Sequence, residues 1–235
     1  MSERDEYTEP TLEEIDRDGA LLEAIAEVHG SSRAAFLAKA TLGSAVLLGA
    51  FAAPASAAHR PAIDTALLDF DLRFEYLQAS FYSEADRLGT IDKMTREQRT
   101  WAETLGAHER AHVRILQQAI GHNIPKKPFY DFRGITERPA AFIKTAVAME
   151  DLTVALLSGQ APQLKERRLA AALFSLLTVE ARHAAWARHI AGFVPTVHAF
   201  DKPKSTRHVA AVVASTHFVA KAPRMSAKKR PRFTG

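Results

Sequence analysis

The sequence predicts an all-α protein, a four-helix bundle with one long crossover, and two observations support that prediction. Apolar residues recur every three to four positions in four long segments, which is the pattern of helices that bury one face. Polar residues interrupt these apolar stripes in a repeated order, a single Glu followed by Glu-x-x-His, twice along the chain. The six residues are Glu75, Glu109, His112, Glu150, Glu180 and His183.

These six residues form a ligand set for metal ions. Burying a charged side chain is costly unless the charge is paired or bound to a metal. Residues three apart on a helix are rotated by about 60°, because each residue turns about 100°, so both side chains of a Glu-x-x-His pair can reach one point. Four carboxylates and two imidazoles from four helices are the set with which helix bundles hold two iron or manganese ions. We therefore predict two iron ions, or two manganese ions, as the cofactor.

Residues 1–57 are predicted to be an acidic leader with an export signal, including a leader helix. Residues 1–30 carry ten acidic and two basic side chains, and the uncharged apolar residues 42–53 follow. A small-residue A-x-A site ends at Ala57 and completes the order of a secretory signal. We therefore expect an exported protein, periplasmic or otherwise extracytoplasmic.

The route of export stays open. Residues 32–37 resemble a twin-arginine signal, but Ala34 stands where the second arginine belongs. The apolar segment is short for a spanning helix, which needs about 20 residues. Cleavage after Ala57 and retention as a membrane anchor both fit the pattern. A buried or hairpin helix in a cytoplasmic protein is the alternative.

Residues 58–195 are predicted to form the bundle, and its first two helices are expected at about 63–87 and 95–121. Thr95 and Gln98 have the spacing of a capping box, so the second helix should begin at this point. The residues that follow, up to Gly134, are rich in proline and aromatic side chains. They indicate an ordered crossover and not a tight turn.

The third and fourth helices of the bundle are bounded by proline and glycine. The third is expected to start just after Pro139 and to end at Ser158 and Gly159, since glycine commonly terminates a helix. The fourth is expected to begin near Pro162 and to stop at Gly192.

Residues 196–235 are predicted to be a C-terminal extension, with a short helix at about 208–220 and then a disordered basic tail. After Thr196 only Asp201 is acidic, against nine Lys and Arg residues. Such a tail favours an anionic envelope surface, and a solvated tail without a partner is the alternative. We expect no specific binding to nucleic acid.

Five further residues lie close to the predicted ligands. Tyr82 is two turns from Glu75 on one helix face; we expect it to pack with its hydroxyl at the bundle edge, and a hydrogen bond to a ligand is the alternative. His108 and His189 do not share the ligand stripe, so we expect them at the surface or behind the ligands. Trp101 and Trp186 are expected in the core.

At the ligand motifs the chain resembles the ferritin-like superfamily, and more narrowly the bacterial exported ferritin-like proteins that include the desiccation-related proteins. The resemblance covers about residues 60–200 and implies a ferritin-like four-helix bundle. It is carried by residues 74–82, 108–112, 149–151, 178–185 and 199–203. It also implies a role for each ligand: terminal carboxylates at Glu75 and Glu150, bridging carboxylates at Glu109 and Glu180, imidazoles at His112 and His183.

The resemblance and the ligand set together imply a di-metal carboxylate protein of the cell envelope. We expect it to contain iron and to oxidise Fe(II) or consume dioxygen or peroxide in stress protection. Manganese catalase-like peroxide dismutation, a non-catalytic metal-stabilised envelope protein, and iron storage in a cage are the alternatives. The expected partners are metal ions, dioxygen or peroxide, the anionic surface, and a second copy in a homodimer. The absence of cysteine excludes disulfides, Cys-ligated zinc and iron–sulfur clusters.

Overall fold

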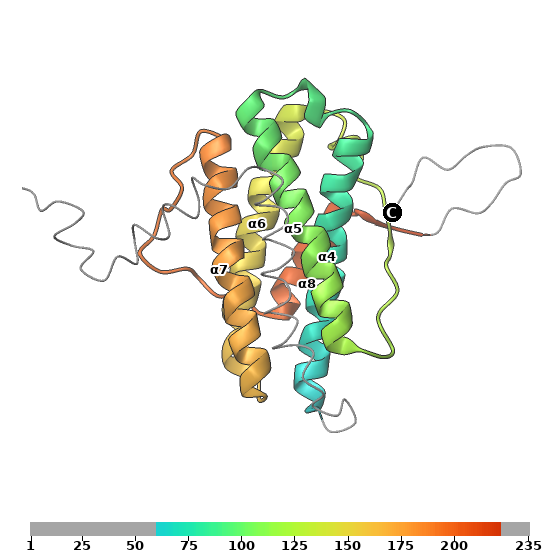
Figure 1. Cartoon of the computed structure of the whole chain (residues 1–235), viewed down its shortest axis with the longest axis vertical. Helices are drawn as coiled ribbons and strands as arrows, with labels where there is room; N and C mark the ends of the chain where they lie inside the picture. Colours follow the sequence, from blue (N-terminus) through green and yellow to red (C-terminus); the bar gives the residue numbers. More distant parts are fainter. Residues whose placement is uncertain (1–59, 222–235) are drawn as a thin grey trace, which may run out of the picture. The chain divides into compact units, whose positions relative to one another are not determined.

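Four long helices pack side by side in the computed structural model, which describes residues 60–221 (Figure 1). They are α4 (Ala62–Arg87), α5 (Arg96–Ile120), α6 (Pro139–Gln160) and α7 (Arg167–Ile190). The closest packing joins α4 to α5 and α6 to α7. This arrangement confirms the predicted all-α bundle. The leader, the export signal and most of the basic tail lie outside the described residues.

The link between α4 and α5 is short and locally specified. Gly89 has a positive φ of 67°, and the 3-10 helix η2 (Ile91–Lys93) follows it. The Thr95 hydroxyl accepts a hydrogen bond from the backbone N–H of Gln98 at 3.3 Å, and the Gln98 side chain accepts one from the N–H of Thr95 at 3.1 Å. The predicted capping box is therefore confirmed, and α5 begins where its sequence indicates.

The crossover between α5 and α6 is ordered and forms a small sheet that the sequence did not predict. Strand β1 (Phe129–Tyr130) pairs antiparallel with β2 (Val219–Ala220) near the end of the described residues. Phe132, just beyond β1, is buried against Phe81 and Phe218, with ring centroids 5.3 Å apart in each pair. The crossover thus covers one side of the aromatic core.

The third helix ends one residue beyond the predicted Gly159, and the role of this glycine differs from the predicted one. Helix α6 continues to Gln160 and leads into the 3-10 helix η3 (Ala161–Gln163). The backbone of Lys204 passes over Gly159, so a Cβ at residue 159 would collide with the Lys204 carbonyl oxygen. The N–H of Lys204 donates to the carbonyl oxygen of Ala155 at 2.8 Å. The glycine therefore provides room for a close approach and does not terminate the helix.

The predicted start of the fourth helix at Pro162 is wrong. Pro162 lies in η3, and α7 begins at Arg167. No side chain of its own first residues caps this helix. Instead the buried carboxylate of Asp64, on α4, accepts hydrogen bonds from the backbone N–H groups of Lys165 at 2.9 Å and Glu166 at 2.8 Å. A distant residue thus satisfies the amides of the N-cap residue Glu166 and of Lys165 before it, where the chain enters α7.

The C-terminal helix is shorter than predicted. Helix α8 (Thr206–Thr216) follows its N-cap residue Ser205, whose hydroxyl accepts a hydrogen bond from the N–H of His208 at 3.2 Å. It ends at His217, where φ is 54°, and the chain then enters β2. Val209 of α8 and Phe218 are buried in the main apolar cluster. The extension therefore contributes to the core of the described protein.

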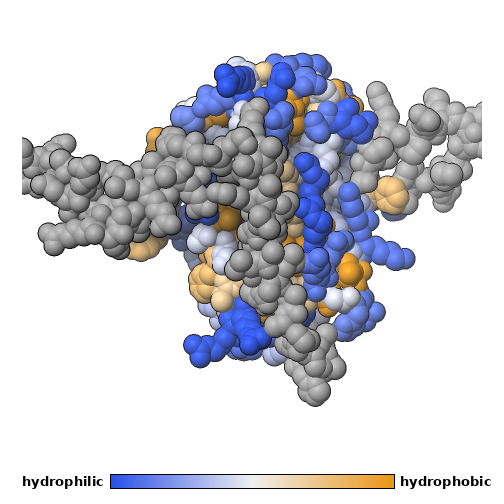
Figure 2. All heavy atoms as spheres, viewed as in Figure 1, coloured by the Kyte–Doolittle hydropathy of each residue, from blue (hydrophilic) through white to orange (hydrophobic). Residues whose placement is uncertain are grey.

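An aromatic cluster fills the core beside the candidate site. The rings of Phe81 and Phe142 stack with centroids 4.7 Å apart, and Trp101 meets Phe142 edge-on at 5.9 Å. Trp101 is fully buried as predicted, whereas Trp186 is only partly buried against the core. On the face in Figure 2 most of the described surface is hydrophilic, with small apolar patches between. Among the described helices none is long and apolar enough to cross a membrane.

Candidate metal centre

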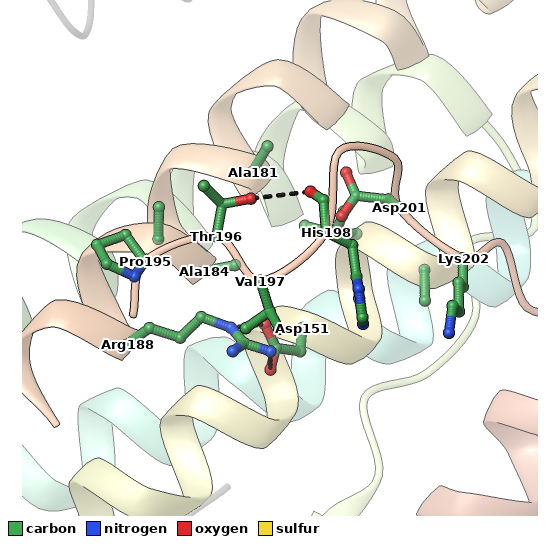
Figure 3. A pocket seen from close by; sticks show the side chains of 13 residues that line it. Asp151, Ala181, Ala184, Arg188, Pro195, Thr196, Val197, His198, Asp201 and Lys202 are labelled. Atoms are coloured by element: carbon green, nitrogen blue, oxygen red, sulfur yellow. Dashed lines mark hydrogen bonds and ion pairs between the residues drawn. The ribbon is translucent and has the colours of Figure 1, made fainter. Parts of the chain in front are cut away.

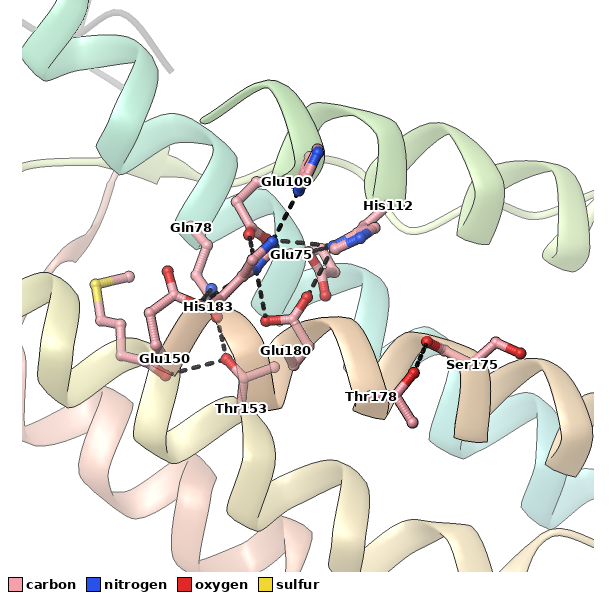
Figure 4. A network of polar contacts seen from close by, with 12 residues as sticks. Glu75, Gln78, Glu109, His112, Glu150, Thr153, Ser175, Thr178, Glu180 and His183 are labelled. Atoms are coloured by element: carbon pink, nitrogen blue, oxygen red, sulfur yellow. Dashed lines mark hydrogen bonds and ion pairs between the residues drawn. The ribbon is translucent and has the colours of Figure 1, made fainter. Parts of the chain in front are cut away.

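The six predicted ligand residues come together inside the bundle (Figure 4). Each helix of the bundle contributes, and His112, the most exposed of the six side chains, has only 8% of its surface accessible. The positions follow from the helix period: in each Glu-x-x-His pair the two residues lie on one face, which the apolar stripe turns toward the core.

The first group of ligand atoms surrounds His112. Its Nδ1 lies 2.9 Å from Oε1 of Glu180, 3.5 Å from Oε2 of Glu109 and 3.6 Å from Oε2 of Glu75. One ligand atom from each of these four residues lies within 4.8 Å of the others. Three carboxylates and one imidazole therefore face a common point.

The second group surrounds His183 in the same way. Its Nδ1 lies 3.1 Å from Oε1 of Glu109, 3.4 Å from Oε2 of Glu180 and 3.8 Å from Oε2 of Glu150. Glu109 and Glu180 thus belong to both groups, each with a different oxygen toward each imidazole. The arrangement is two neighbouring four-residue groups that share two carboxylates.

The four carboxylates differ in pKa. Burial raises the pKa of Glu75 and of Glu150 well above the usual value, and the nearby Glu109 carboxylate raises both further. Burial also acts to raise the pKa of Glu109, but pairing with His112 and His183 holds it below the usual range. Burial and the Glu109 charge act to raise the pKa of Glu180 as well, but His183 and His112 lower it. The outer carboxyl groups therefore favour the protonated form in the metal-free protein, and the two shared ones favour the ionised form.

The two imidazoles have raised pKa values. Burial alone would lower the pKa of His183, but the Glu180 and Glu109 carboxylates raise it to about 10. The pKa of His112 is raised in the same way: burial acts to lower it, and the neighbouring carboxylates raise it well above the usual value. Two imidazolium groups thus balance the two shared carboxylates, which keeps the metal-free core close to neutral.

The hydroxyl of Tyr82 does not lie at the bundle edge, so the first expectation for this residue is wrong. Tyr82 is 1% exposed, and its hydroxyl donates to Oε1 of Glu150 at 2.6 Å. Gln78 Nε2 donates to Oε2 of the same carboxylate at 3.4 Å, and the Thr153 hydroxyl donates to Oε1 of Gln78 at 2.5 Å. Figure 4 shows Gln78 of α4 beside Glu150 and Thr153 of α6.

His108 lies directly behind one ligand. Its Nδ1 is 2.9 Å from Nε2 of His183, on the side of the ring that faces away from the carboxylates. Burial lowers the pKa of His108, and the charges of His183 and His112 lower it further, to about 4. His108 is therefore neutral at pH 7 and can accept a hydrogen bond. His189, in contrast, is at the surface, 3.4 Å from Glu97.

The chemistry of the group fits two divalent cations. In the described residues, seven buried atoms of this cluster approach one another as ion pairs yet have no partner in hydrogen-bond geometry. Such atoms need a partner, because a buried polar atom without one costs about 1–3 kcal/mol. They are Glu75 Oε2, His112 Nδ1, His183 Nδ1 and both oxygens of Glu109 and of Glu180.

A separate surface pocket lies between α6, α7 and the loop that follows α7 (Figure 3). Asp151 and Arg188 face each other in it and form a bidentate ion pair, at 2.8 and 2.6 Å. The loop after α7 closes one side, where the Thr196 hydroxyl donates to the carbonyl oxygen of His198 at 3.1 Å. None of the six candidate ligands lines this pocket, so it is not the candidate metal centre.

The fold and the cluster define a class of protein, a four-helix bundle with buried carboxylate and histidine groups that could hold two metal ions. The chain belongs to the ferritin-like domain family, whose model matches residues 63–192. The match covers more than half of the chain and includes all six candidate ligands. No curated protein matches the chain.

Sequence reasoning missed Gln78 and Thr153 and did not find the partner of His108. A signal was present for the first two: each is a polar residue three positions after a lone Glu, at Glu75 and at Glu150, within an apolar stripe. For His108 the sequence holds no such signal, because its partner lies on another helix.

Proposed function

We propose that this chain binds two metal ions, iron in the first place, and oxidises Fe(II) with dioxygen or peroxide. The observation that carries the proposal is the position of Glu109 and Glu180, which each turn one oxygen toward His112 and the other toward His183. A carboxylate shared in this way can bridge two ions. Glu75 and Glu150 would each hold one ion from the outside.

The residues of the chain would set the conditions for the reaction. Carboxylate oxygens and imidazole nitrogens suit iron and manganese, and two iron ions held here would supply the two electrons that reduction of one O–O bond requires. Glu109 and Glu180 are fully buried, so bulk water does not reach them and their charges act through a low dielectric. Tyr82 holds Glu150 in one orientation through its hydroxyl.

We propose further that the protein acts in the cell envelope under stress, as a member of the exported, desiccation-related group. The support is the order of residues 33–57 and the motif resemblance. The basic residues after 220 would contact an anionic envelope surface, and the chain would form a homodimer. Fractionation of cells that produce the full chain tests the location: recovery of the protein in the cytoplasm alone would contradict it.

The decisive experiment is metal analysis followed by turnover on one sample. Full-length protein is loaded anaerobically with Fe(II) and Mn(II) both present, and ions per chain are counted before dioxygen and peroxide consumption is measured. Two iron ions with Fe(II) oxidation support the proposal. Two manganese ions with peroxide dismutation indicate a catalase-like protein, and two ions without turnover indicate a structural role. A protein that binds neither metal contradicts the proposal, and size-exclusion chromatography separates a storage cage from a dimer.

A further inference from the structure

We infer that the two halves of the centre are not equivalent: the half formed by Glu150 and His183 binds the first ion, and the half formed by Glu75 and His112 binds the second ion more weakly. This inference rests on the proposed function, because it takes the six residues as metal ligands. It goes beyond that proposal by assigning an order of loading from the side chains that support each half.

The carboxylate of Glu150 is held at both oxygens. Tyr82 donates to Oε1 at 2.6 Å and Gln78 donates to Oε2 at 3.4 Å. Both donors are themselves buried and fixed, since Gln78 accepts from Thr153 and the Tyr82 ring packs against Trp101. Glu150 therefore loses little side-chain freedom when an ion binds.

The imidazole of His183 is held from behind. Nδ1 faces the carboxylates and Nε2 lies 2.9 Å from Nδ1 of His108. A histidine that ligates a metal through one nitrogen generally donates a hydrogen bond through the other, and that bond fixes the tautomer and the ring orientation. His108 can accept this hydrogen bond, so Nδ1 of His183 is already directed at the ligand group.

The other half lacks these supports. Among the described residues, no side chain donates a hydrogen bond to Glu75 in the way that Tyr82 and Gln78 donate to Glu150, and Oε2 of Glu75 has no hydrogen-bond partner. No described side chain is hydrogen-bonded to Nε2 of His112 as His108 is to Nε2 of His183. Within the described part of the chain, Glu75 and His112 therefore lack the side-chain support that Glu150 and His183 have.

The repeat in the sequence shows the same asymmetry. Tyr82 lies seven residues after Glu75, and the corresponding residue seven after Glu150 is Leu157. His108 directly precedes Glu109, and Val179 directly precedes Glu180. The second helix pair repeats the ligands but has apolar residues where the first pair has a hydroxyl and an imidazole. Neither leucine nor valine can form the missing hydrogen bond.

Loss of a residue that orients a ligand generally costs about ten- to hundredfold in metal affinity. We therefore expect the first ion to bind about ten- to hundredfold more tightly than the second, because only the half that binds the first ion has these orienting residues. The tighter ion would remain with the protein, and the weaker half would exchange its ion.

The test is an anaerobic calorimetric titration of metal-free full-length protein with Mn(II), which avoids oxidation and needs no turnover. Glu75→Ala should keep one ion at the affinity of the first wild-type ion, and Glu150→Ala should lose that affinity. Tyr82→Phe should weaken the first ion about tenfold, by loss of an orienting hydrogen bond. Tyr76→Phe is the matched control, because Tyr76 is also buried on α4 but its hydroxyl accepts a hydrogen bond from Gln117, away from the six candidate ligands.

His108 provides a second, independent variant should Tyr82→Phe fail to fold. His108→Leu should weaken the same ion, whereas His108→Gln keeps an acceptor and should lose less. His122→Leu, at an exposed position beyond α5, is the control.

Equal affinities for the two ions in the wild type, or equal losses in Glu75→Ala and Glu150→Ala, would overturn the inference and leave the proposed function standing. Failure of the wild type to bind either Mn(II) or Fe(II) would overturn both.

Discussion

The two helix pairs of the bundle carry the same ligand pattern but differ in what holds them in place. Helix α5 of the first pair starts with a cap from its own residues, Thr95 and Gln98. Helix α7 of the second pair has no such cap and depends on Asp64 of α4. The candidate ligands of the second pair depend on the first as well, since α4 supports Glu150 and α5 supports His183.

This difference teaches that a repeated ligand motif does not imply repeated support. The first pair specifies much of its own geometry through neighbouring residues, whereas the second pair receives buried polar contacts from across the bundle. Such buried contacts contribute more to stability than exposed ones, because a buried carboxylate or donor that loses its partner cannot form a hydrogen bond with water instead. The effects of substitutions on metal binding and stability should therefore differ between the two pairs in a definite order.

The largest effect is expected at the shared carboxylates, where the two pairs meet. Glu180→Ala should abolish binding of both ions, because Glu180 belongs to both ligand groups. In the metal-free protein it should also cost about 3–5 kcal/mol, since buried imidazolium groups lose a partner. Metal analysis and urea unfolding measure the two effects. Glu103→Ala, at an exposed carboxylate on α5, is the control; two ions retained in Glu180→Ala would refute the shared site.

The next largest effect should come from pH acting on the metal-free protein. The pKa of His183 is raised to about 10 in the folded state, from an unfolded value of about 6.5. A raised pKa stabilises the fold fully below the unfolded value, and this contribution is lost as pH rises toward 10. The raised pKa values of Glu75 and Glu150 act with the same sign. Thermal unfolding of the metal-free protein should therefore show a falling Tm from pH 7 to pH 10.

Metal binding should respond to pH in the opposite direction. Ions displace the protons of both imidazoles and of the outer carboxyl groups, so metal affinity rises with pH.

A Tm of the metal-free protein that rises between pH 7 and pH 10 would contradict the assigned protonation states.

A smaller loss is expected when the second pair loses its cap. Asp64→Ala removes a buried carboxylate that accepts from two backbone amides at the start of α7. Hydrogen bonds to a charged group contribute about 1.5–3 kcal/mol, so a loss of that size is expected in urea unfolding. Asp86→Ala, at an exposed position near the end of α4, should change stability little. Equal losses in both variants would show that Asp64 is not the cap of α7.

The smallest effect is expected at the cap of the first pair. Thr95→Ala removes a capping residue that lies at the surface, where water can replace the lost hydrogen bond, and should cost about 1 kcal/mol. The same urea unfolding experiment measures it. A loss larger than that of Asp64→Ala would reverse the comparison between the two pairs.

Local signals were sufficient for part of the fold and for the choice of the six residues. The capping box at Thr95 involves neighbours in sequence, so it can be read directly. The six candidate ligands could be named because the helix period fixes which residues share a face, and the structure groups them inside the bundle.

Contacts between distant segments could not be predicted. The role of Gly159 and the start of α7 were not predicted because they involve contacts with Lys204 and Asp64, which are far away in sequence. The partner of Tyr82 was missed for a related reason: periodicity places Tyr82 on the face of Glu75, but its hydroxyl reaches across to Glu150. The helix period predicts the face of a helix on which a side chain lies. It does not predict how far that side chain is from a residue on a neighbouring helix.

The small sheet of β1 and β2 has a consequence for the order in which the protein is made. Phe129 pairs with Ala220, so synthesis of β2 follows that of α6, α7 and α8. The crossover between α5 and α6 therefore leaves the ribosome long before its pairing strand exists. Closing so long a loop carries an entropy cost that short-range contacts avoid, so this step follows helix packing during folding. A nascent chain stalled before residue 219 would expose the polar backbone edge of Phe129 and Tyr130 until translation resumes.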